Sequence, residues 1–260
     1  MSAPLRCLAT TTPGLEPLLA GEVSRLGADA VLTDHGSVEF DTNADLLADA
    51  LLGLRTAHRV TVRLAAFRAR TFAELERHAA AIAWNGVLDP AGAVHFRVTS
   101  KKSRLYHQDA VAERLERSVV AALPRVEMVR AAGAAEQREA EVDRLPDVQR
   151  FIVRLHRDEV TISADAAGAL LHRRGWRRDV AKAPLRETLA AAMLLGLDWQ
   201  GREPLHDPFC GSGTIPIEAA LLARNIAPGI ARRFAAECWP SVGAKRLDAA
   251  RLRARALERT

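Results

Sequence analysis

The chain has 260 residues, 48% apolar and 27% charged, which is the ordinary composition of a soluble globular protein. Lys and Arg exceed Asp and Glu by 37 − 32 = 5, a balance that suits a polyanionic partner without requiring one. Cys7, Cys210 and Cys238 lie far apart, which argues against a zinc site or a disulfide framework and fits a reducing cytoplasm. No apolar run is long enough for a secretory core or a bilayer span. We therefore expect a cytoplasmic protein that uses no membrane and no metal.

Residues 1–57 predict a small α+β unit. Apolar residues recur at helical spacing behind Thr12-Pro13, where a proline at the first helical position leaves no donor unsatisfied, and Gly27 ends this helix. Residues 31–40 alternate around His35-Gly36 and predict a hairpin, and residues 46–54 predict a second amphipathic helix. Strand, helix, hairpin and helix on this scale are typical of a ferredoxin-like unit.

Residues 58–165 predict a second α+β unit. Val60, Val62 and Leu64 alternate with polar neighbours, which predicts a half-buried strand with a basic outer face. Thr71 and Glu74 have the spacing of a capping box ahead of a helix. Residues 131–149 lack apolar order, and we expect a surface helix or loop there. The other predicted elements are strands at 95–99, 151–155 and 160–164, the last two joined by a turn at 156–159, and a helix at 110–123 that Pro124 ends.

The residue composition of the sequence changes after Asp165. An arginine-rich stretch at 168–178 precedes a very apolar helix at 184–197. Beyond Pro204 we expect a short strand that ends at Asp207, then a glycine turn and a helix from Ile215 to about Arg224. Strand, glycine turn and helix in immediate succession are the opening of a nucleotide- or cofactor-binding α/β sheet.

The glycine turn is the segment of the sequence that indicates a ligand-binding site. Gly211 and Gly213 allow a sharp turn and the close approach of a ligand, and the following helix N-terminus favours a carboxylate or phosphate. No lysine follows, which excludes a Walker loop, and two glycines make a weak dinucleotide fingerprint. S-adenosyl-L-methionine fits better, with its carboxylate over the turn and its ammonium group near Asp207. A lone Gly-Ser-Gly turn is most often an ordinary tight turn, but the whole run 207–214 is more specific.

Residues 207–220 closely resemble the first methyltransferase motif of the THUMP-containing RNA guanine-N2 methyltransferases, a family of large-subunit ribosomal RNA and tRNA enzymes. Residues 171–177 look like the linker signature of that family, with Trp176 where tyrosine is commoner. The likeness covers nearly the full chain and is weakest in the middle. Further similar segments are residues 183–191, the helix that flanks the cofactor, and residues 12–16 and 54–60.

The resemblance implies an α+β ferredoxin-like unit at 1–57, a THUMP RNA-binding domain at 58–165, and the start of an α/β Rossmann-like methyltransferase domain at 166–260. It implies a structured RNA, ribosomal or transfer RNA, as the partner. Leu185 and Thr188 would close the methionine end of S-adenosyl-L-methionine, while Glu218 has an even chance of being structural. The residues that would line the cofactor pocket are Asp207, Phe209, Gly211, Ser212, Gly213 and Thr214.

Two basic clusters are candidates for RNA contact, because phosphate contacts supply much of nucleic-acid affinity. The first, Lys101, Lys102 and Arg104, follows a predicted strand and could equally be a solvated loop. The second surrounds Trp176, and some of its arginines could instead pair with Asp165, Asp179 or Glu187. Its members are Arg173, Arg174, Arg177 and Arg178.

The family places an Asn-Pro-Pro-Tyr or Asp-Pro-Pro-Tyr tetrapeptide after the fourth strand of its sheet. This chain contains no Pro-Pro dipeptide, its only tyrosine is Tyr106, and no acidic residue for the cofactor ribose is evident. We therefore expect an incomplete methyltransferase domain, from a fragment, from a split or frameshifted gene, or in a non-catalytic RNA binder. A methyltransferase acting on a protein or small molecule is a weaker alternative. Guanine N2 is the expected target, with another base atom such as adenine N6 left open.

Overall fold

The computed structural model describes residues 4–130, 147–176 and 185–259. The chain forms two compact units, which are described in turn. The chain changes from unit 1 to unit 2 after Val60 and back after Ala169, a few residues from the predicted domain boundaries after residues 57 and 165. The domain assignment itself stays a prediction. Unit 1 comprises Met1–Val60, Leu170–Phe234 and Ala244–Thr260, and unit 2 comprises Thr61–Ala169 and Ala235–Gly243.

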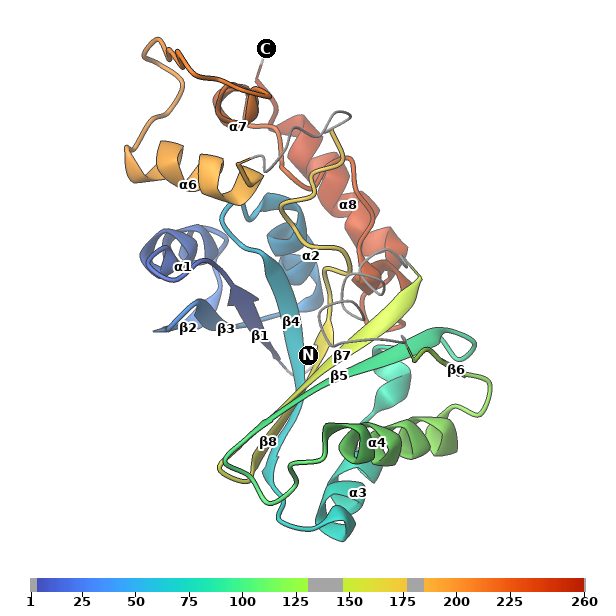
Figure 1. Ribbon diagram of the computed structural model, residues 1–260. Coiled ribbons are helices and arrows are strands. Elements are labelled where there is room, and N and C mark those ends of the chain that lie inside the picture. Colours follow the sequence, from blue (N-terminus) through green and yellow to red (C-terminus); the bar gives the residue numbers. More distant parts are fainter. Residues whose placement is uncertain (1–3, 131–146, 177–184, 260) are drawn as a thin grey trace. The chain divides into compact units, whose positions relative to one another are not determined.

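The first part of unit 1 is a three-stranded sheet with two helices (Figure 1). Strand β3 lies between β1 and β2 and is antiparallel to both, so the predicted hairpin around Gly36 is confirmed. Helix α1 begins at Glu16, which corrects the expected start at Pro13, because Gly14 in between has φ 95° and interrupts a helical backbone. The elements are β1 Leu5–Thr10, α1 Glu16–Arg25, β2 Asp29–Asp34, β3 Ser37–Thr42 and α2 Ala44–Gly53.

The later part of unit 1 is helical: α6 Glu187–Gly196, α7 Thr214–Ala223 and α8 Gly243–Ala256. Figure 1 shows α6 beside α7, and α8 lies along α2 through ion pairs of Arg246 with Asp45 and Arg253 with Asp49. The predicted strand ending at Asp207 is wrong, because residues 204–207 have no strand conformation. A strand there would need a neighbouring strand to satisfy its backbone groups, and the described residues that follow are helices and loops.

The loop after α7 reaches α2 at a glycine. The Gly229 N–H donates to the carbonyl oxygen of Leu52 at 2.9 Å. A Cβ atom at Gly229 would lie 2.8 Å from the Phe234 ring, and 2.9 Å from both the Leu51 oxygen and the Leu52 Cα. Such distances are shorter than van der Waals contact, so this approach of loop to helix requires glycine.

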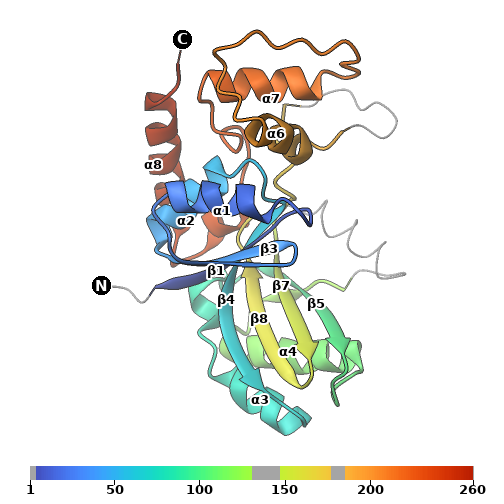
Figure 2. The same cartoon turned by 90° about the vertical axis from the view of Figure 1, so that its left-hand side faces the viewer.

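Unit 2 is a mixed sheet in the order β4-β8-β7-β5-β6, in which β5 runs parallel to β7 and β6. Figure 2 shows β4, β8, β7 and β5 side by side, with α3 and α4 on one side of them. The predicted helices and strands of this unit are confirmed, and their THUMP assignment stays a prediction. The elements are β4 Arg59–Arg68, α3 Phe72–Ala80, η1 Trp84–Gly86, β5 Ala93–Lys101, α4 Gln108–Ala122, β6 Glu127–Met128, β7 Val148–His156, β8 Glu159–Asp165 and η2 Ala235–Cys238.

Two sequence predictions in unit 2 need correction. The outer face of β4 is not basic at its start, because Thr61 is only 2% exposed and lies opposite the fully buried Asp165 of β8. The predicted surface excursion at 131–149 lies mostly outside the described residues, but Val148 and Gln149 belong to strand β7. The capping box of α3 is confirmed, with both the Thr71 and the Glu74 hydrogen bonds present.

An aromatic cluster forms the core between the sheet and the helices of unit 2. Trp84 is 1% exposed and meets the rings of Phe96 and Phe151 edge-on, at centroid distances of 6.0 and 5.1 Å. Its indole N–H donates to Ser118 of α4 at 3.3 Å. No helix among the described residues is long and apolar enough to cross a bilayer.

Truncation of this aromatic core should destabilise the protein strongly. We expect Trp84→Ala to lower the free energy of unfolding by about 3–5 kcal/mol, because it removes buried area and leaves a cavity. Tyr106→Ala is the matched control, since Tyr106 is 66% exposed, and its effect should stay within about 0.5 kcal/mol. Urea unfolding followed by tryptophan fluorescence and circular dichroism measures both, and equal losses would contradict this core assignment.

Candidate functional site

The glycine turn of unit 1 ends at helix α7. Gly213 is the N-cap of α7 with φ 76°, and its N–H donates to the Cys210 carbonyl oxygen at 2.8 Å. Asp207 Oδ1 accepts a hydrogen bond from the Phe209 N–H at 3.1 Å, which closes the first half of the turn. Gly211 has φ 53°, and a Cβ there would have no neighbour nearer than 4.0 Å. The turn is therefore held by its own backbone and stays open on its outer side.

This turn has the donor set for the amino-acid end of S-adenosyl-L-methionine. The N–H groups of Gly211 and Ser212 donate to no acceptor in the described part of the chain, and both residues are exposed. Together with the N-terminal dipole of α7 they favour a carboxylate. The Asp207 carboxylate, half-buried at the start of the turn, suits an ammonium group. The residues present fit the group that the sequence predicts.

The other predicted cofactor residues differ in exposure. Phe209 is 93% and Leu185 37% exposed, so both are accessible to a ligand. Thr188 is fully buried in α6, and its hydroxyl lies 3.3 Å from His58 Nδ1. This contact corrects the prediction for Thr188, because a side chain without exposed surface is not available to the cofactor. Thr214, the first residue of α7, is only 4% exposed, and its place in a cofactor site stays a prediction.

Arg174 and Glu218 form a buried ion pair within unit 1. Arg174 Nε donates to Glu218 Oε1 at 3.4 Å, and the two side chains are 2% and 0% exposed. The remaining Arg174 nitrogens donate to the carbonyl oxygens of Leu171 at 2.9 Å and Arg55 at 2.6 Å. Burial raises the pKa of Glu218, against the opposing effect of the Arg174 and Arg55 charges. Glu218, left open between cofactor and structure by the sequence, is structural.

Arg55 and Glu22 extend this cluster into the ferredoxin-like part. Arg55, 8% exposed, donates to the Ile226 oxygen at 2.7 Å and to the Leu221 oxygen at the C-terminal end of α7. Glu22 of α1 accepts hydrogen bonds from the N–H groups of Arg55 at 2.8 Å and Thr56 at 3.0 Å, and from the Thr56 hydroxyl. We call Glu22, Arg55, Arg174 and Glu218 the buried charge network. Sequence reasoning marked residues 54–60 only as similar to the family and missed this role.

The predicted RNA-binding residues have four different outcomes. Arg174 is corrected, because its guanidinium is 3% exposed and engaged inside unit 1. Arg173 is exposed, and Arg177 and Arg178 lie outside the described residues. The remaining candidates, Lys101, Lys102 and Arg104, are exposed together in unit 2 and stay predictions.

Two histidines lie next to the network. His58 accepts or donates to Thr12 Oγ1 at 2.9 Å through Nε2 and to Thr188 through Nδ1. Burial, then the charges of Arg186 and Arg174, lower the pKa of His58. Burial and next the Arg186 charge lower the pKa of His172 to about 4. Both imidazoles are therefore neutral near pH 7, and that of His58 serves as a hydrogen-bonding group.

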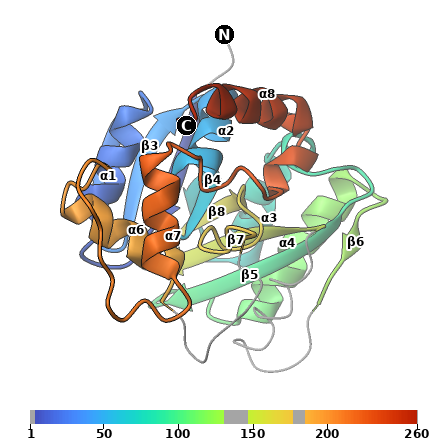
Figure 3. The same cartoon turned by 90° about the horizontal axis from the view of Figure 1, so that it is seen from above.

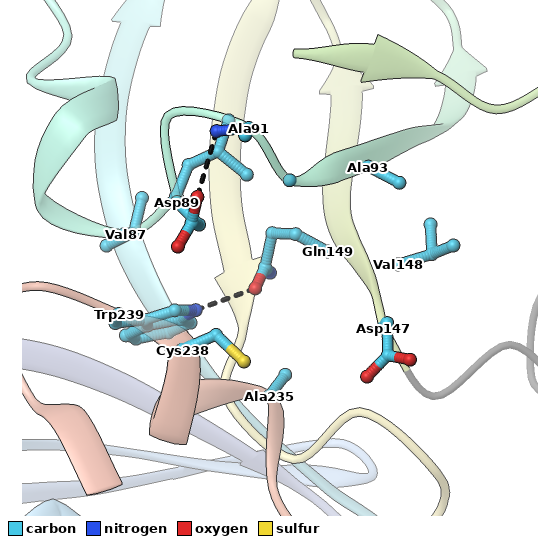
Figure 4. A pocket seen from close by; sticks show the side chains of 12 residues that line it. Val87, Asp89, Ala91, Ala93, Asp147, Val148, Gln149, Ala235, Cys238 and Trp239 are labelled. Atoms are coloured by element: carbon cyan, nitrogen blue, oxygen red, sulfur yellow. Dashed lines mark hydrogen bonds between the residues drawn. The ribbon is translucent and has the colours of Figure 1, made fainter. Parts of the chain in front are cut away.

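A hollow that the sequence did not predict lies in unit 2 (Figure 4). It has a volume of about 300 Å³ and is mostly apolar. Trp239, 2% exposed, donates its indole N–H to Gln149 Oε1 at 2.6 Å, and Gln149 Nε2 donates to the Asp165 carbonyl oxygen. These bonds anchor residues 235–243 to unit 2. The described residues contain no cluster of three or more His, Cys, Asp or Glu side chains that could hold a metal ion.

The structure combines a ferredoxin-like part with a pair of helices, α6 and α7. The glycine turn before α7 is open and resembles that of a methyltransferase. Residues 6–61 match the family described as the RlmL ferredoxin-like domain, which confirms the predicted ferredoxin-like unit. Residues 174–260 match the family described as the RMKL-like methyltransferase domain. Both matches are similarities of parts of this chain to the RlmL-like methyltransferases.

Two curated relatives extend the likeness to most of the chain. YpsC of Bacillus subtilis, named as an RNA methyltransferase, is 37% identical over 94% of this chain and 61% of its own length. The Ribosomal RNA large subunit methyltransferase K/L of Photobacterium profundum is 35% identical over 87% of this chain and 30% of its own length. The chain therefore spans less than two thirds of either relative.

Two solved structures share the fold. A Listeria monocytogenes protein described as an N6-adenine-specific DNA methylase superposes with a TM-score of 0.83 at 34% identity, covering 98% of this chain and 65% of its own. The methyltransferase-like protein SMU.472, crystallised with SAH, has a TM-score of 0.80 at 30% identity, covering 100% of this chain and 66% of its own.

The structural role of Arg174 can be tested against its neighbour. We expect Arg174→Ala to cost about 3–5 kcal/mol of unfolding free energy, because it leaves Glu218 buried without its ion-pair partner. Arg173→Ala removes the same charge from an exposed side chain and should cost no more than about 0.5 kcal/mol. Chemical denaturation of both variants decides the matter, and a tolerated Arg174→Ala would overturn the assignment.

The histidines predict a pH dependence of stability. The unfolded chain protonates His172 near its ordinary pKa of 6.5, whereas the folded protein does so near 4. The unfolded state thus binds more protons between these values, and stability present above pH 6.5 is lost as the pH falls toward 4. His172→Gln should reduce the drop in the urea midpoint between about pH 7.5 and about pH 5. The exposed His206→Gln is the control, and identical pH dependence in the two variants would refute the prediction.

Proposed function

We propose that this chain supplies the RNA-binding part and the first cofactor-contacting turn of an S-adenosyl-L-methionine-dependent RNA methyltransferase. The observation that carries the proposal is the open turn at Asp207–Gly213, which lies inside the segment similar to a methyltransferase domain. The name of YpsC and the SAH bound to SMU.472 support both the RNA substrate and the cofactor. Following the family resemblance of its motifs, we take guanine N2 of ribosomal or transfer RNA as the methyl acceptor.

The chemistry asked of this chain is binding and orientation. Bound S-adenosyl-L-methionine would supply a methyl group on a sulfonium, which transfers directly to the acceptor nitrogen without a metal. The amides of Gly211 and Ser212 would hold the carboxylate, and Asp207 the ammonium group, so that the methyl donor has one fixed position. Positioning and exclusion of water account for most of the rate in such transfers.

The RNA would be held by unit 2. Lys101, the last residue of strand β5, and the following Lys102 and Arg104 are all exposed, where they can approach phosphates. Arg173 is the remaining described candidate in unit 1. Contacts of this kind release counterions, so the affinity they provide falls steeply with salt.

A non-catalytic RNA binder is the second candidate. The two candidates share salt-dependent RNA binding and differ in whether the glycine turn meets S-adenosyl-L-methionine.

One experiment on the purified chain separates them. Saturation-transfer NMR with S-adenosyl-L-methionine at about millimolar concentration detects weak contact, and RNA binding is measured in parallel at two salt concentrations. We expect weak cofactor contact that Gly211→Ala abolishes, since a Cβ enters the open side of the turn and strains a left-handed backbone. Gly14→Ala is the matched control, because Gly14 has φ 95° and open space around it.

The outcomes are distinct. RNA binding without any cofactor contact would favour the non-catalytic binder. Equal cofactor contact in both glycine variants would remove the role of the turn. Absence of salt-dependent RNA binding would sink both candidates.

A further inference from the structure

A hollow with a volume of about 450 Å³ lies within unit 1, where three helices end. Its wall includes Arg25 and Gly53, the last residues of α1 and α2, and Leu257, which follows α8. The loop after α7 contributes Asn225 and Pro228. Figure 3 shows α8 lying beside α2. We call this cavity the helix-end hollow, and its volume is within the range of about 300–1,000 Å³ that small-molecule sites occupy.

Much of the wall of the helix-end hollow is apolar. Leu52 and Ala250 are 2% and 1% exposed, whereas Leu257 is 65% exposed. The hollow therefore reaches from the surface of unit 1 to its core. A wall of this kind favours the apolar part of a ligand, because burial removes hydrocarbon from water.

One residue of the wall is a buried arginine with unused hydrogen-bonding capacity. Arg55 is 8% exposed, and its Nη2 donates to the carbonyl oxygens of Ile226 at 2.7 Å and Leu221 at 3.4 Å. Its Nη1 is buried and has no hydrogen-bond partner among the described residues. A buried guanidinium nitrogen without an acceptor is unfavourable. The position therefore calls for an acceptor that the surrounding residues do not supply.

The helix dipoles explain why cations gather here but leave Arg55 Nη1 unexplained. The C-terminal end of a helix carries partial negative charge and favours an arginine. Other donors already meet carbonyl oxygens at these ends. Asn225 Nδ2 donates to the Leu257 oxygen at 3.0 Å, and the Gly229 N–H donates to the Leu52 oxygen at 2.9 Å. Donor capacity remains beyond what the helix ends use.

The charges in the wall leave room for an anion. Arg253 pairs with Asp49 at 2.7 Å, so these two residues of the wall compensate each other. Arg25 is exposed and has no hydrogen bond or ion pair with any residue that the structure describes. The carboxylates of the buried charge network interact with Arg55 but do not line the hollow. Arg25 and Arg55 Nη1 are thus the donors that the hollow offers to a ligand.

We propose that the helix-end hollow binds a small carboxylic acid with an apolar body, whose carboxylate lies between Arg25 and Arg55. The planar guanidinium group matches the two oxygens of a carboxylate in shape and charge. The apolar body would lie against Leu52 and its neighbours. This inference goes beyond the proposed RNA methyltransferase function and does not depend on it. The hollow is at the opposite end of α7 from the glycine turn.

A carboxylate with a hydrocarbon body suits this hollow better than a phosphate does. Phosphate carries charge and strong acceptors on all sides, so some of its oxygens would lose their hydration against the apolar wall without gaining a donor. A carboxylic acid of this kind carries its charge at one end only. Its other end buries hydrocarbon, which is the chemistry of the rest of the wall.

The test titrates the purified full chain, isotope-labelled on its arginine side chains, with hexanoate as the probe. NMR signals of the guanidinium groups report contact at each arginine. We expect hexanoate to shift the signals of Arg25 and Arg55. At equal ionic strength it should bind about tenfold more tightly than hexanol or inorganic phosphate, because charge-assisted hydrogen bonds and apolar burial add only in hexanoate. Hexanol has the apolar body without the charge, and phosphate has the charge without the body.

A charge variant tests the arginine that is not part of the buried charge network. Arg25→Gln removes an exposed charge from the wall and should weaken hexanoate binding about fivefold or more. Arg202→Gln is the matched control, since Arg202 is an exposed arginine of unit 1 outside the wall, and its affinity should be unchanged.

A steric variant tests the location of the probe. A Cβ at Gly53 has no neighbour within 4 Å, so Gly53→Leu places a side chain in open space at the wall and should weaken hexanoate binding about tenfold. Gly86→Leu is the control, because Gly86 has the same open space around it and lies in unit 2. Circular dichroism melting of every variant shows whether a lost affinity reflects unfolding.

The results that overturn the proposal are specific. Absence of shifts at Arg25 and Arg55, or equal affinity for hexanoate and either comparison compound, would refute a site for an apolar carboxylic acid. Equal affinity of Arg25→Gln and Arg202→Gln, or of Gly53→Leu and Gly86→Leu, would refute its location in the helix-end hollow. RNA binding and cofactor contact are measured separately, so each of these failures is distinct from a failure of the proposed function.

Discussion

The buried charge network is the constraint on which unit 1 depends. Taking Glu22, Arg55, Arg174 and Glu218 out of water is costly unless each charge is met by an opposite charge or a hydrogen bond. The partners come from α1, from the segment after α2, from residue 174 and from α7, so one arrangement brings them together, although Arg55 Nη1 and Glu218 Oε2 find no hydrogen-bond partner among the described residues. Buried ion pairs add little net stability compared with apolar packing. Their contribution here is specificity, because any other docking leaves an unpaired buried charge.

This arrangement gives the two ends of α7 different tasks. Arg55 meets carbonyl oxygens at and just beyond the C-terminal end, where the helix dipole favours a cation. The N-terminal end carries the glycine turn, which no side chain of the turn closes. The ferredoxin-like part therefore does more than accompany the methyltransferase-like segment. It holds the helix whose other end offers backbone amides to a ligand.

Unit 2 is organised around an apolar core and not around buried charges. Its sheet buries one face under α3 and α4 around Trp84, while the opposite face stays polar at the end of the β7–β8 turn. Period-two alternation makes this division unavoidable, since every buried residue of a strand has neighbours on the other face. The same alternation of apolar and polar residues along the strands therefore produces both the buried core and the charged surface of unit 2. Residues 235–243 join this unit through the Trp239–Gln149 hydrogen bond, although these two residues lie 90 positions apart in the sequence.

The sequence by itself determined the helices, the hairpin, the capping box at Thr71 and the glycine turn, because periodicity, caps and left-handed glycines are local properties. Only the tertiary structure decided which arginines face solvent. Arg173 and Arg174 are chemically identical neighbours, yet one is exposed and the other is paired with Glu218. The strand expected at Asp207 failed for the same kind of reason, since a strand exists only where another strand takes its hydrogen bonds. Burial and pairing depend on residues distant in the chain, and no local pattern contains them.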